Sequence, residues 1–481
     1  MTRRIHRSRP HRAVPFRTPA LVSLLSIAVG ACGASPDGSA AASAAAEASG
    51  ADVVAFVGAN VIPMDEERIL ANHTVIVRDG VIAEIGPAAQ VSVPAGATQV
   101  DATGRYLIPG LAEMHAHIPA GDAATVENTL FLYVAGGVTT IRGMQGSPQH
   151  LELRDRVAAG ELIGPRIYAA GPAVSGNSAR TPEAAAALVQ EQQAAGYDLL
   201  KVQTGVSRES FDAMAEAAHR LGIPFAGHVP EAVGLNRALE ARYSSIDHLD
   251  SYLQALAGYP DGNAPTPTGL FGFYLIDEAD EAKIPEVVAA TIAAGVWNVP
   301  TLTLVEHLAS PEDPERMAER PELAYMPAQT VQQWIQRKRA FQNDARFTPE
   351  RGARFIEIRR QLVKALHDAG APLALGSDAP QWWNVPGFSA LRELELMVAA
   401  GLTPFQAMSA GTRDAARLMG ADNEWGTIAV GQRADMVLLD ANPLADITSV
   451  WQRAGVMYGG RWLPREELDA RLEAIAASNR E

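Results

Sequence analysis

The sequence predicts an α/β protein whose main part is a (β/α)8 TIM barrel, with a small β-sandwich domain built from both flanks of that barrel. Three observations lead to this prediction. Short apolar strand-like runs alternate with alanine-rich amphipathic runs between residues 109 and 424. Strand-like texture precedes this region, at 51–108, and returns after it, at 425–465. The 481-residue chain, 47% of it hydrophobic, is long enough for both parts.

The first 32 residues predict a lipoprotein signal peptide. Arginines without any acidic residue precede the apolar run 19–31, which is too short for a typical transmembrane helix. The run ends at Cys32, the only cysteine of the chain. The segment V-G-A-C is similar to the lipobox of bacterial lipoproteins, in which the cysteine sulfur is lipidated; a free thiol is the alternative. Residues 33–50 are small and low in complexity, which predicts a flexible tether.

These features predict an exported protein that is lipid-anchored in the cell envelope, on the periplasmic side of the outer membrane. Contact with the membrane is expected only through the anchor. The formal net charge of −15 argues against nucleic acid as a partner. The expected partner is a small-molecule or dipeptide substrate, and assembly into a homo-oligomer stays open.

The flanking domain begins with short alternating apolar runs, among which Asp79-Gly80 is a typical hairpin turn. We expect the stretches 426–443 and 456–463 to complete the same small sheet. A C-terminal helix or tail follows at 466–481.

The barrel strands are predicted from short apolar runs that end next to glycine, proline or polar residues. After the strand that carries an H-x-H segment at 115–117, we expect strands at 137–143, 165–171, 197–203, 224–229, 244–249, 297–304 and 372–378. The amphipathic runs between them have helix-capping residues, such as Thr181 and Ser207, and a terminal glycine. Two longer segments, 250–285 and 305–350, follow strand ends and are interpreted as lids or pocket walls, with a plain surface excursion as the alternative.

His115 and His117 are separated by one residue, so on a strand they point to the same face and can hold a metal ion. Four further groups fall at the ends of later strands, and these ends converge at one mouth of a barrel. Each has a structural alternative, such as a core histidine or a helix cap, but the joint placement favours a metal site. The four groups are Lys201, His228, His248 and Asp378.

Several motifs together resemble the amidohydrolase superfamily. They are H-A-H after L-I-P-G-L, the lysine at a strand end, G-H, D-H-L, S-D and G-Q-R-A-D-M-V-L-L-D. More narrowly, the chain is similar to the imidazolonepropionase-like and Xaa-Pro dipeptidase-like branch. The resemblance implies two divalent metal ions, usually zinc. It also implies that His115, His117 and Asp378 bind the more buried ion, that His228 and His248 bind the exposed one, and that a carbamylated Lys201 bridges both.

The implied activity is hydrolysis of an amide bond, in dipeptides or N-acyl amino acids, by attack of a metal-bound hydroxide. Asp378 would be the catalytic residue that carries the proton to the leaving amine. A cyclic amide, lactone or phosphotriester is the alternative substrate for the same centre. A non-catalytic solute-binding lipoprotein is disfavoured, because all six groups of the set are present.

Substrate contacts are harder to read from the sequence. Arg142 is a candidate to pair with a substrate carboxylate, although a structural salt bridge is the favoured interpretation. Trp382 and Trp383 follow Asp378 closely and are predicted to form an apolar pocket wall, with packing under the loop as the alternative. Asp250 is predicted to hold a neighbouring metal ligand in place.

Overall fold

The structure is a computed structural model that describes residues 53–480. The predicted signal peptide, Cys32 and the tether 33–50 lie outside these residues. The described chain alternates strands and helices and has the mixed α/β character predicted from the sequence. Within 53–480, no helix has both the length and the apolar composition needed to cross a membrane.

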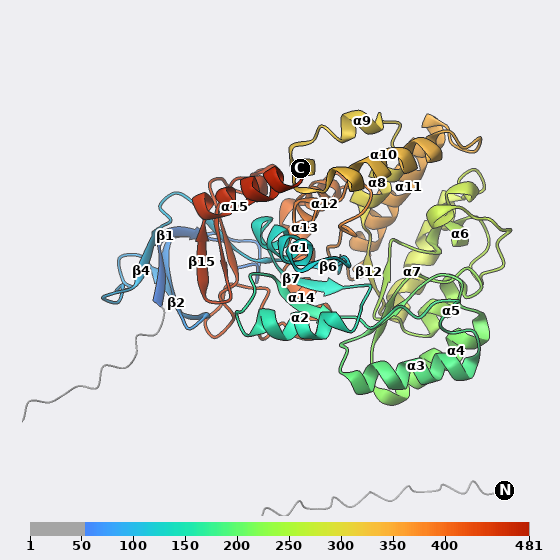
Figure 1. The fold of residues 1–481 in the computed structure, drawn as a ribbon, viewed down its shortest axis with the longest axis horizontal. Coiled ribbons are helices and arrows are strands. Elements are labelled where there is room, and N and C mark those ends of the chain that lie inside the picture. The colour runs from blue at the N-terminus through green and yellow to red at the C-terminus, as the bar shows by residue number, and fades with distance from the viewer. Residues whose placement is uncertain (1–52, 481) are drawn as a thin grey trace, which may run out of the picture. The chain divides into compact units, whose positions relative to one another are not determined.

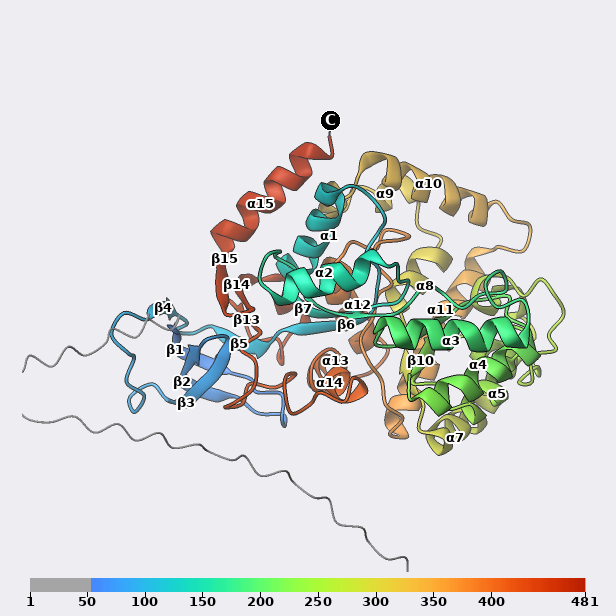
Figure 2. The same ribbon diagram turned by 60° about the horizontal axis from the view of Figure 1, so that its bottom comes forward.

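One sheet combines strands from both flanks of the central region (Figures 1 and 2). Its order is β15-β14-β13-β5-β1-β2-β3, with β4 paired to β1. The two flanks therefore meet as predicted, and a two-layered sandwich stays a prediction. The strands are β1 (Val53–Val61), β2 (Leu70–Arg78), β3 (Val81–Pro87), β4 (Thr98–Asp101), β5 (Tyr106–Pro109), β13 (Met436–Leu439), β14 (Arg453–Tyr458) and β15 (Arg461–Pro464).

Local sequence explains the first hairpin of this sheet. Asp79 and Gly80 have φ angles of 48° and 74°, and they connect β2 to β3 through the tight turn that this pair favours. Phe56, Val75 and Met436 come from both flanks and pack in one buried cluster. Burial of these side chains holds the two ends of the described chain together.

The central region contains seven parallel strands in two sheets. The first has the order β6-β7-β8 and the second β12-β11-β10-β9. Isolated parallel bridges join Ala170 to Leu199, Asn298 to Leu373 and Ala116 to Ala379. A fully closed ring of strands stays a prediction. The strands are β6 (Leu111–Ala116), β7 (Val138–Gly143), β8 (Arg166–Ala169), β9 (Leu200–Val202), β10 (Phe225–Gly227), β11 (Ser245–Asp247) and β12 (Trp297–Val299).

Two of the predicted barrel strands differ from the structure. The strand expected at 297–304 ends at Val299, because Thr301 has a φ of 50° and a helix begins at Leu302. The segment 372–378 forms single bridges rather than a continuous strand. It still lies between β12 and β6, so Asp378 reaches the position that the prediction required.

Helices follow most of the parallel strands, and their ends agree with the sequence signals. Thr181 accepts a hydrogen bond from the Ala184 amide, and Ser207 accepts one from the Ser210 amide, each over 3.2 Å. These helices are α1 (Ala123–Ala135), α2 (Gln149–Ala158), α3 (Pro182–Ala195), α4 (Arg208–Leu221), α5 (Gly234–Glu240), α7 (Ile284–Ala294), α11 (Pro349–Asp368), α12 (Phe388–Ala399), α13 (Pro404–Ala410), α14 (Arg413–Leu418) and α15 (Arg465–Ser478).

The second long segment is largely helical, whereas much of the first consists of turns and loops between short helices. The first, 250–285, and the second, 305–350, both supply side chains to the wall of one cavity, namely Gln254, Phe271 and Leu308. They are therefore pocket walls at these positions. The first segment contains α6 (Tyr252–Leu256), η1 (Leu270–Leu275) and η2 (Glu281–Lys283). The second contains most of α8 (Leu302–Ala309), together with α9 (Pro314–Met317), η3 (Pro321–Tyr325) and α10 (Ala328–Gln342). A further short helix, η4 (Ile447–Trp451), lies between β13 and β14.

Candidate metal centre

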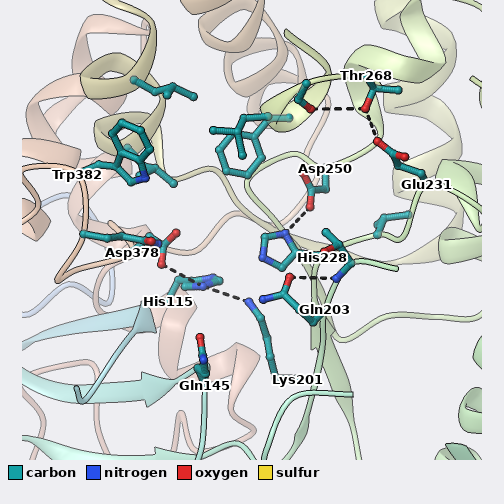
Figure 3. Close-up of a pocket in the computed structure, with 18 of the residues that line it drawn as sticks. His115, Gln145, Lys201, Gln203, His228, Glu231, Asp250, Thr268, Asp378 and Trp382 are labelled. Atoms are coloured by element: carbon teal, nitrogen blue, oxygen red, sulfur yellow. Dashed lines mark hydrogen bonds and ion pairs between the residues drawn. The ribbon is translucent and has the colours of Figure 1, made fainter. Parts of the chain in front are cut away.

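The predicted ligand residues converge on a cavity of about 320 Å³ (Figure 3). Five of the six line it: His115, His117, Lys201, His228 and Asp378. The sixth, His248, is fully buried behind them, and its ring centroid lies 4.4 Å from that of His115 and 4.7 Å from that of His228. Strands β6, β9, β10 and β11 thus deliver groups from distant parts of the sequence to one place.

Asp378 is the carboxylate at the middle of this cluster. Its Oδ1 lies 2.6 Å from His117 Nε2 and 3.4 Å from His115 Nε2, and its Oδ2 lies 3.8 Å from His248 Nδ1. Burial raises the pKa of Asp378, but His115, His117 and the Lys201 ammonium outweigh this effect and lower the pKa to about 2. Asp378 is therefore ionised at neutral pH and can act as a ligand or a proton acceptor.

A buried chain of hydrogen bonds orients His115. Its Nδ1–H donates to Asp247 Oδ2 over 2.7 Å, and Asp247 also accepts from Ser245 Oγ and from the Arg142 guanidinium. This arrangement leaves His115 Nε2 on the cavity side, facing Lys201 Nζ at 3.2 Å. Burial is the largest cause that lowers the pKa of His115 well below its usual value, which favours the neutral imidazole that binds metals.

The other two histidines are held in the same manner. His228 Nδ1 lies 2.6 Å from Asp250 Oδ2, so Asp250 has the supporting role that the sequence predicted. His248 Nδ1 lies 2.9 Å from Thr301 Oγ1. Among residues 53–480, His248 Nε2 has no hydrogen-bond partner although it is buried. A buried nitrogen without a partner is costly, and a metal ion would satisfy it.

The donor set fits a metal ion. One ligand atom each from His115, His248 and Asp378 lies within 4.8 Å of the others. Imidazole and carboxylate are typical ligands of zinc and related divalent ions. The predicted division assigned His115 and Asp378 to one ion and His248 to the other. This compact group differs from that division, because it contains all three residues. The division itself stays a prediction.

The structure places two of the three candidate substrate contacts away from the cavity. Arg142 is fully buried and donates to Met114 O, Ser245 Oγ and Asp247, so it forms the structural salt bridge that the sequence favoured. Trp383 is 1% exposed and packs beside Trp334 in the interior. Trp382 does line the cavity (Figure 3).

The sequence reasoning missed two supporting residues, Asp247 and Thr301. Asp247 is the last residue of β11, directly before His248, and its side chain reaches His115 Nδ1. The I-D-H-L segment contained this signal, since an apolar strand rarely ends in a buried carboxylate without a partner. Thr301 gave no such signal, because its position depends on the early end of β12.

Comparison with known proteins agrees with this geometry. A sequence model described as "Amidohydrolase family" matches residues 106–463. Imidazolonepropionase of Paracoccus denitrificans is 26% identical over 426 residues, which cover 81% of this chain and 94% of that enzyme. The structure of bottromycin amidohydrolase is similar with a TM-score of 0.67 and 25% identity, over 88% of this chain and 90% of that one. A Xaa-Pro dipeptidase structure has the same fold, with a TM-score of 0.61 at 19% identity, over 86% of this chain and all of the other.

Proposed function

Because the chain belongs to the amidohydrolase family and is a hydrolase of carbon–nitrogen bonds, we propose that it cleaves amide bonds in dipeptides or N-acyl amino acids. The observation that carries this proposal is the cavity itself. It is lined by His115, His117, Lys201, His228 and Asp378. Groups of these types within one small cavity are suited to hydrolysis assisted by metal ions.

We propose that the cavity holds two divalent metal ions, with zinc as the expected metal. The proposed ligands are His115, His117, Lys201, His228, His248 and Asp378. When bound, the ions would supply polarisation of the scissile carbonyl and a water molecule of lowered pKa. The buried, unpartnered Nε2 of His248 supports this assignment, as does the neutral form favoured for His115.

Lys201 is proposed to react with carbon dioxide. Lys201 is 1% exposed, and this burial lowers the pKa of its side chain. The lowered pKa favours the neutral amine that carbamate formation needs. The nitrogen attacks the carbon of carbon dioxide and loses a proton, which leaves an anionic carbamate. This product replaces a buried amine by oxygen atoms that can bind metal ions.

Asp378 is proposed to move the proton during amide cleavage. Its ionised carboxylate accepts a proton from the attacking water and delivers it to the amide nitrogen as the carbon–nitrogen bond breaks. Protonation is required because an amide nitrogen is otherwise a poor leaving group.

The test is amino-acid release from a library of dipeptides and N-acyl amino acids, by protein that starts at Gly33 and is expressed with zinc and bicarbonate. Turnover of one subset supports the proposal. Two metals per chain without turnover would direct attention to lactones, cyclic amides and phosphotriesters. A protein that binds no metal and turns over no substrate would contradict the proposed hydrolytic centre.

A further inference from the structure

The cavity lining contains two chemically different groups of side chains. The apolar group comes from η1, α8 and the loop after Asp378, with the side chains of Leu270, Phe271, Leu304, Leu308 and Trp382. The polar group includes Gln203, Gln254, Thr268 and Glu231. In Figure 3, Trp382 and Glu231 stand on opposite sides of His228 and Asp250. A substrate in this cavity can therefore contact the apolar ring of Trp382 and, across the cavity, the carboxylate of Glu231.

Glu231 is held in a defined position at this wall. The hydroxyl of Thr268, which is 1% exposed, donates to Glu231 Oε1. Glu231 itself is exposed, and no ion pair within residues 53–480 involves it. An exposed carboxylate that is oriented by a buried hydroxyl can accept further hydrogen bonds from a bound cation.

Among the described residues that line the cavity, no cationic side chain is placed to bind a substrate carboxylate. Among the described residues that line the cavity, Lys201 is the single lysine and arginine is absent. Lys201 is buried and already contacts His115 Nε2 at 3.2 Å. Arg142 is directed into the interior rather than into the cavity. The cavity walls therefore offer a carboxylate for recognition, whereas their single lysine belongs to the ligand cluster.

We propose that Glu231 determines specificity by binding a positively charged group of the substrate. The preferred substrates would be amides that carry an ammonium or guanidinium group, with an apolar part facing Trp382 and Phe271. Of the two proposed substrate classes, this favours dipeptides with a positively charged group over N-acyl amino acids, whose only charge is a carboxylate. This inference rests on the proposed amide hydrolysis for its catalytic consequence, but binding of the cation can be measured separately.

The experiment uses four related probes: L-argininamide, L-citrullinamide, and the Nα-acetyl derivative of each. Citrulline replaces the guanidinium by a neutral urea of nearly the same shape, and acetylation removes the α-ammonium. Binding to the zinc-loaded protein is measured by isothermal titration calorimetry. We expect at least one of the two positive charges to strengthen binding about 10- to 100-fold, the range for a hydrogen bond between charged groups.

Glu231→Gln should remove this preference, and Glu231→Lys should reverse it in favour of an N-acyl amino acid over its amide. The matched control is Glu240→Gln, which changes the net charge equally at an exposed position of α5 outside the cavity lining. It should leave the preference as in the unmodified protein. Equal weakening of all four probes in Glu231→Gln would instead indicate a structural role for the Thr268 contact and overturn the inference.

Turnover of matched arginine and citrulline dipeptides separates this inference from the proposed function. A charge preference in binding that depends on Glu231, without hydrolysis of any dipeptide, supports the inference and contradicts the proposed function. Hydrolysis with no charge preference, or a preference unchanged in Glu231→Gln, overturns the inference and leaves the proposed function in place.

Discussion

Replacement of Asp247 by asparagine tests how much the metal centre depends on its buried support. The carboxylate accepts hydrogen bonds from His115 Nδ1 at 2.7 Å, Ser245 Oγ at 2.7 Å and Arg142 Nη2 at 3.2 Å. Asparagine keeps the shape of the side chain but removes its charge, and it turns one acceptor oxygen into an NH2 donor. Either His115 or Arg142 would then face a donor instead of an acceptor.

Two effects of different size follow. Removal of one partner from a buried ion pair costs about 3 to 5 kcal/mol, because the other charge stays buried without compensation. Asp247 and Arg142 are both fully buried, so solvent cannot replace the lost contact. Loss of the partner that orients a metal-binding histidine weakens metal binding by about 10- to 100-fold. We therefore expect Asp247→Asn to be less stable and to bind zinc more weakly.

Zinc affinity is measured by competition with a chromophoric chelator. The free energy of unfolding is measured by guanidinium titration in excess chelator, so that no bound metal contributes to the stability of either protein. The matched control is Asp212→Asn, since Asp212 pairs with Arg237 and Arg208 and its side chain is 42% exposed. This control should lose at most about 1 kcal/mol and keep its zinc affinity. Zinc affinity of Asp247→Asn within twofold of the unmodified protein would refute the reasoning.

Lys201→Ala should lose bound metal, and short carboxylic acids should partly restore activity; full metal content by atomic absorption would contradict a bridging lysine. Asp378→Asn should abolish turnover, and a near-normal rate would remove Asp378 from the mechanism. Burial raises the pKa of Glu393 from 4.5 to about 7, so folded Glu393 keeps a proton that the unfolded chain has lost. The free energy of unfolding should therefore fall by about 3 kcal/mol as pH rises from 4.5 through 7, relative to that of Glu393→Gln. The same difference between the two proteins at pH 4.5 and at pH 8 would exclude this. Cys32→Ala should abolish lipid labelling and signal cleavage, and unchanged labelling would exclude the predicted anchor.

The sequence was informative about the proposed ligand set because the histidines and the lysine lie in or directly after short strands. His115 and His117 share a strand face, and Lys201, His228 and His248 lie within or directly after short parallel strands. This placement follows from apolar runs and their boundaries, which are local features. Membership of the amidohydrolase family is likewise confirmed by the match over 106–463.

The candidate substrate contacts that lie away from the cavity share a physical cause, which is that direction and burial of a side chain depend on distant segments. Arg142 turns inward because Asp247, more than a hundred positions later, offers a buried carboxylate. Trp383 is buried by Trp334 of the second long segment, whereas its neighbour Trp382 faces the cavity. Nothing within a few residues of either side chain distinguishes these outcomes.

The end of β12 illustrates the same dependence. Proline and threonine after Val299 are compatible with an extended strand, and the prediction continued it to 304. In the structure, Glu393 of α12 accepts hydrogen bonds from the amides of Leu302 and Thr303, which are the first residues of α8. A carboxylate at this position satisfies amides that a helix start leaves open. The helix is therefore favoured by a residue far along the chain.

The position of β5 has a consequence for the order of events during synthesis. This strand has β1 at one edge and β13 at the other, and Leu107 is paired with Leu438. The ribosome releases β1 to β5 early, but β13 follows only after every element from β6 to α14 has been made. Until then, β5 offers an open edge that other chains can join. A chain interrupted before Met436 would keep this unpaired edge and could aggregate through it. A chain that continues past β13 pairs the edge, so the last strands remove a risk of aggregation that the first strands create.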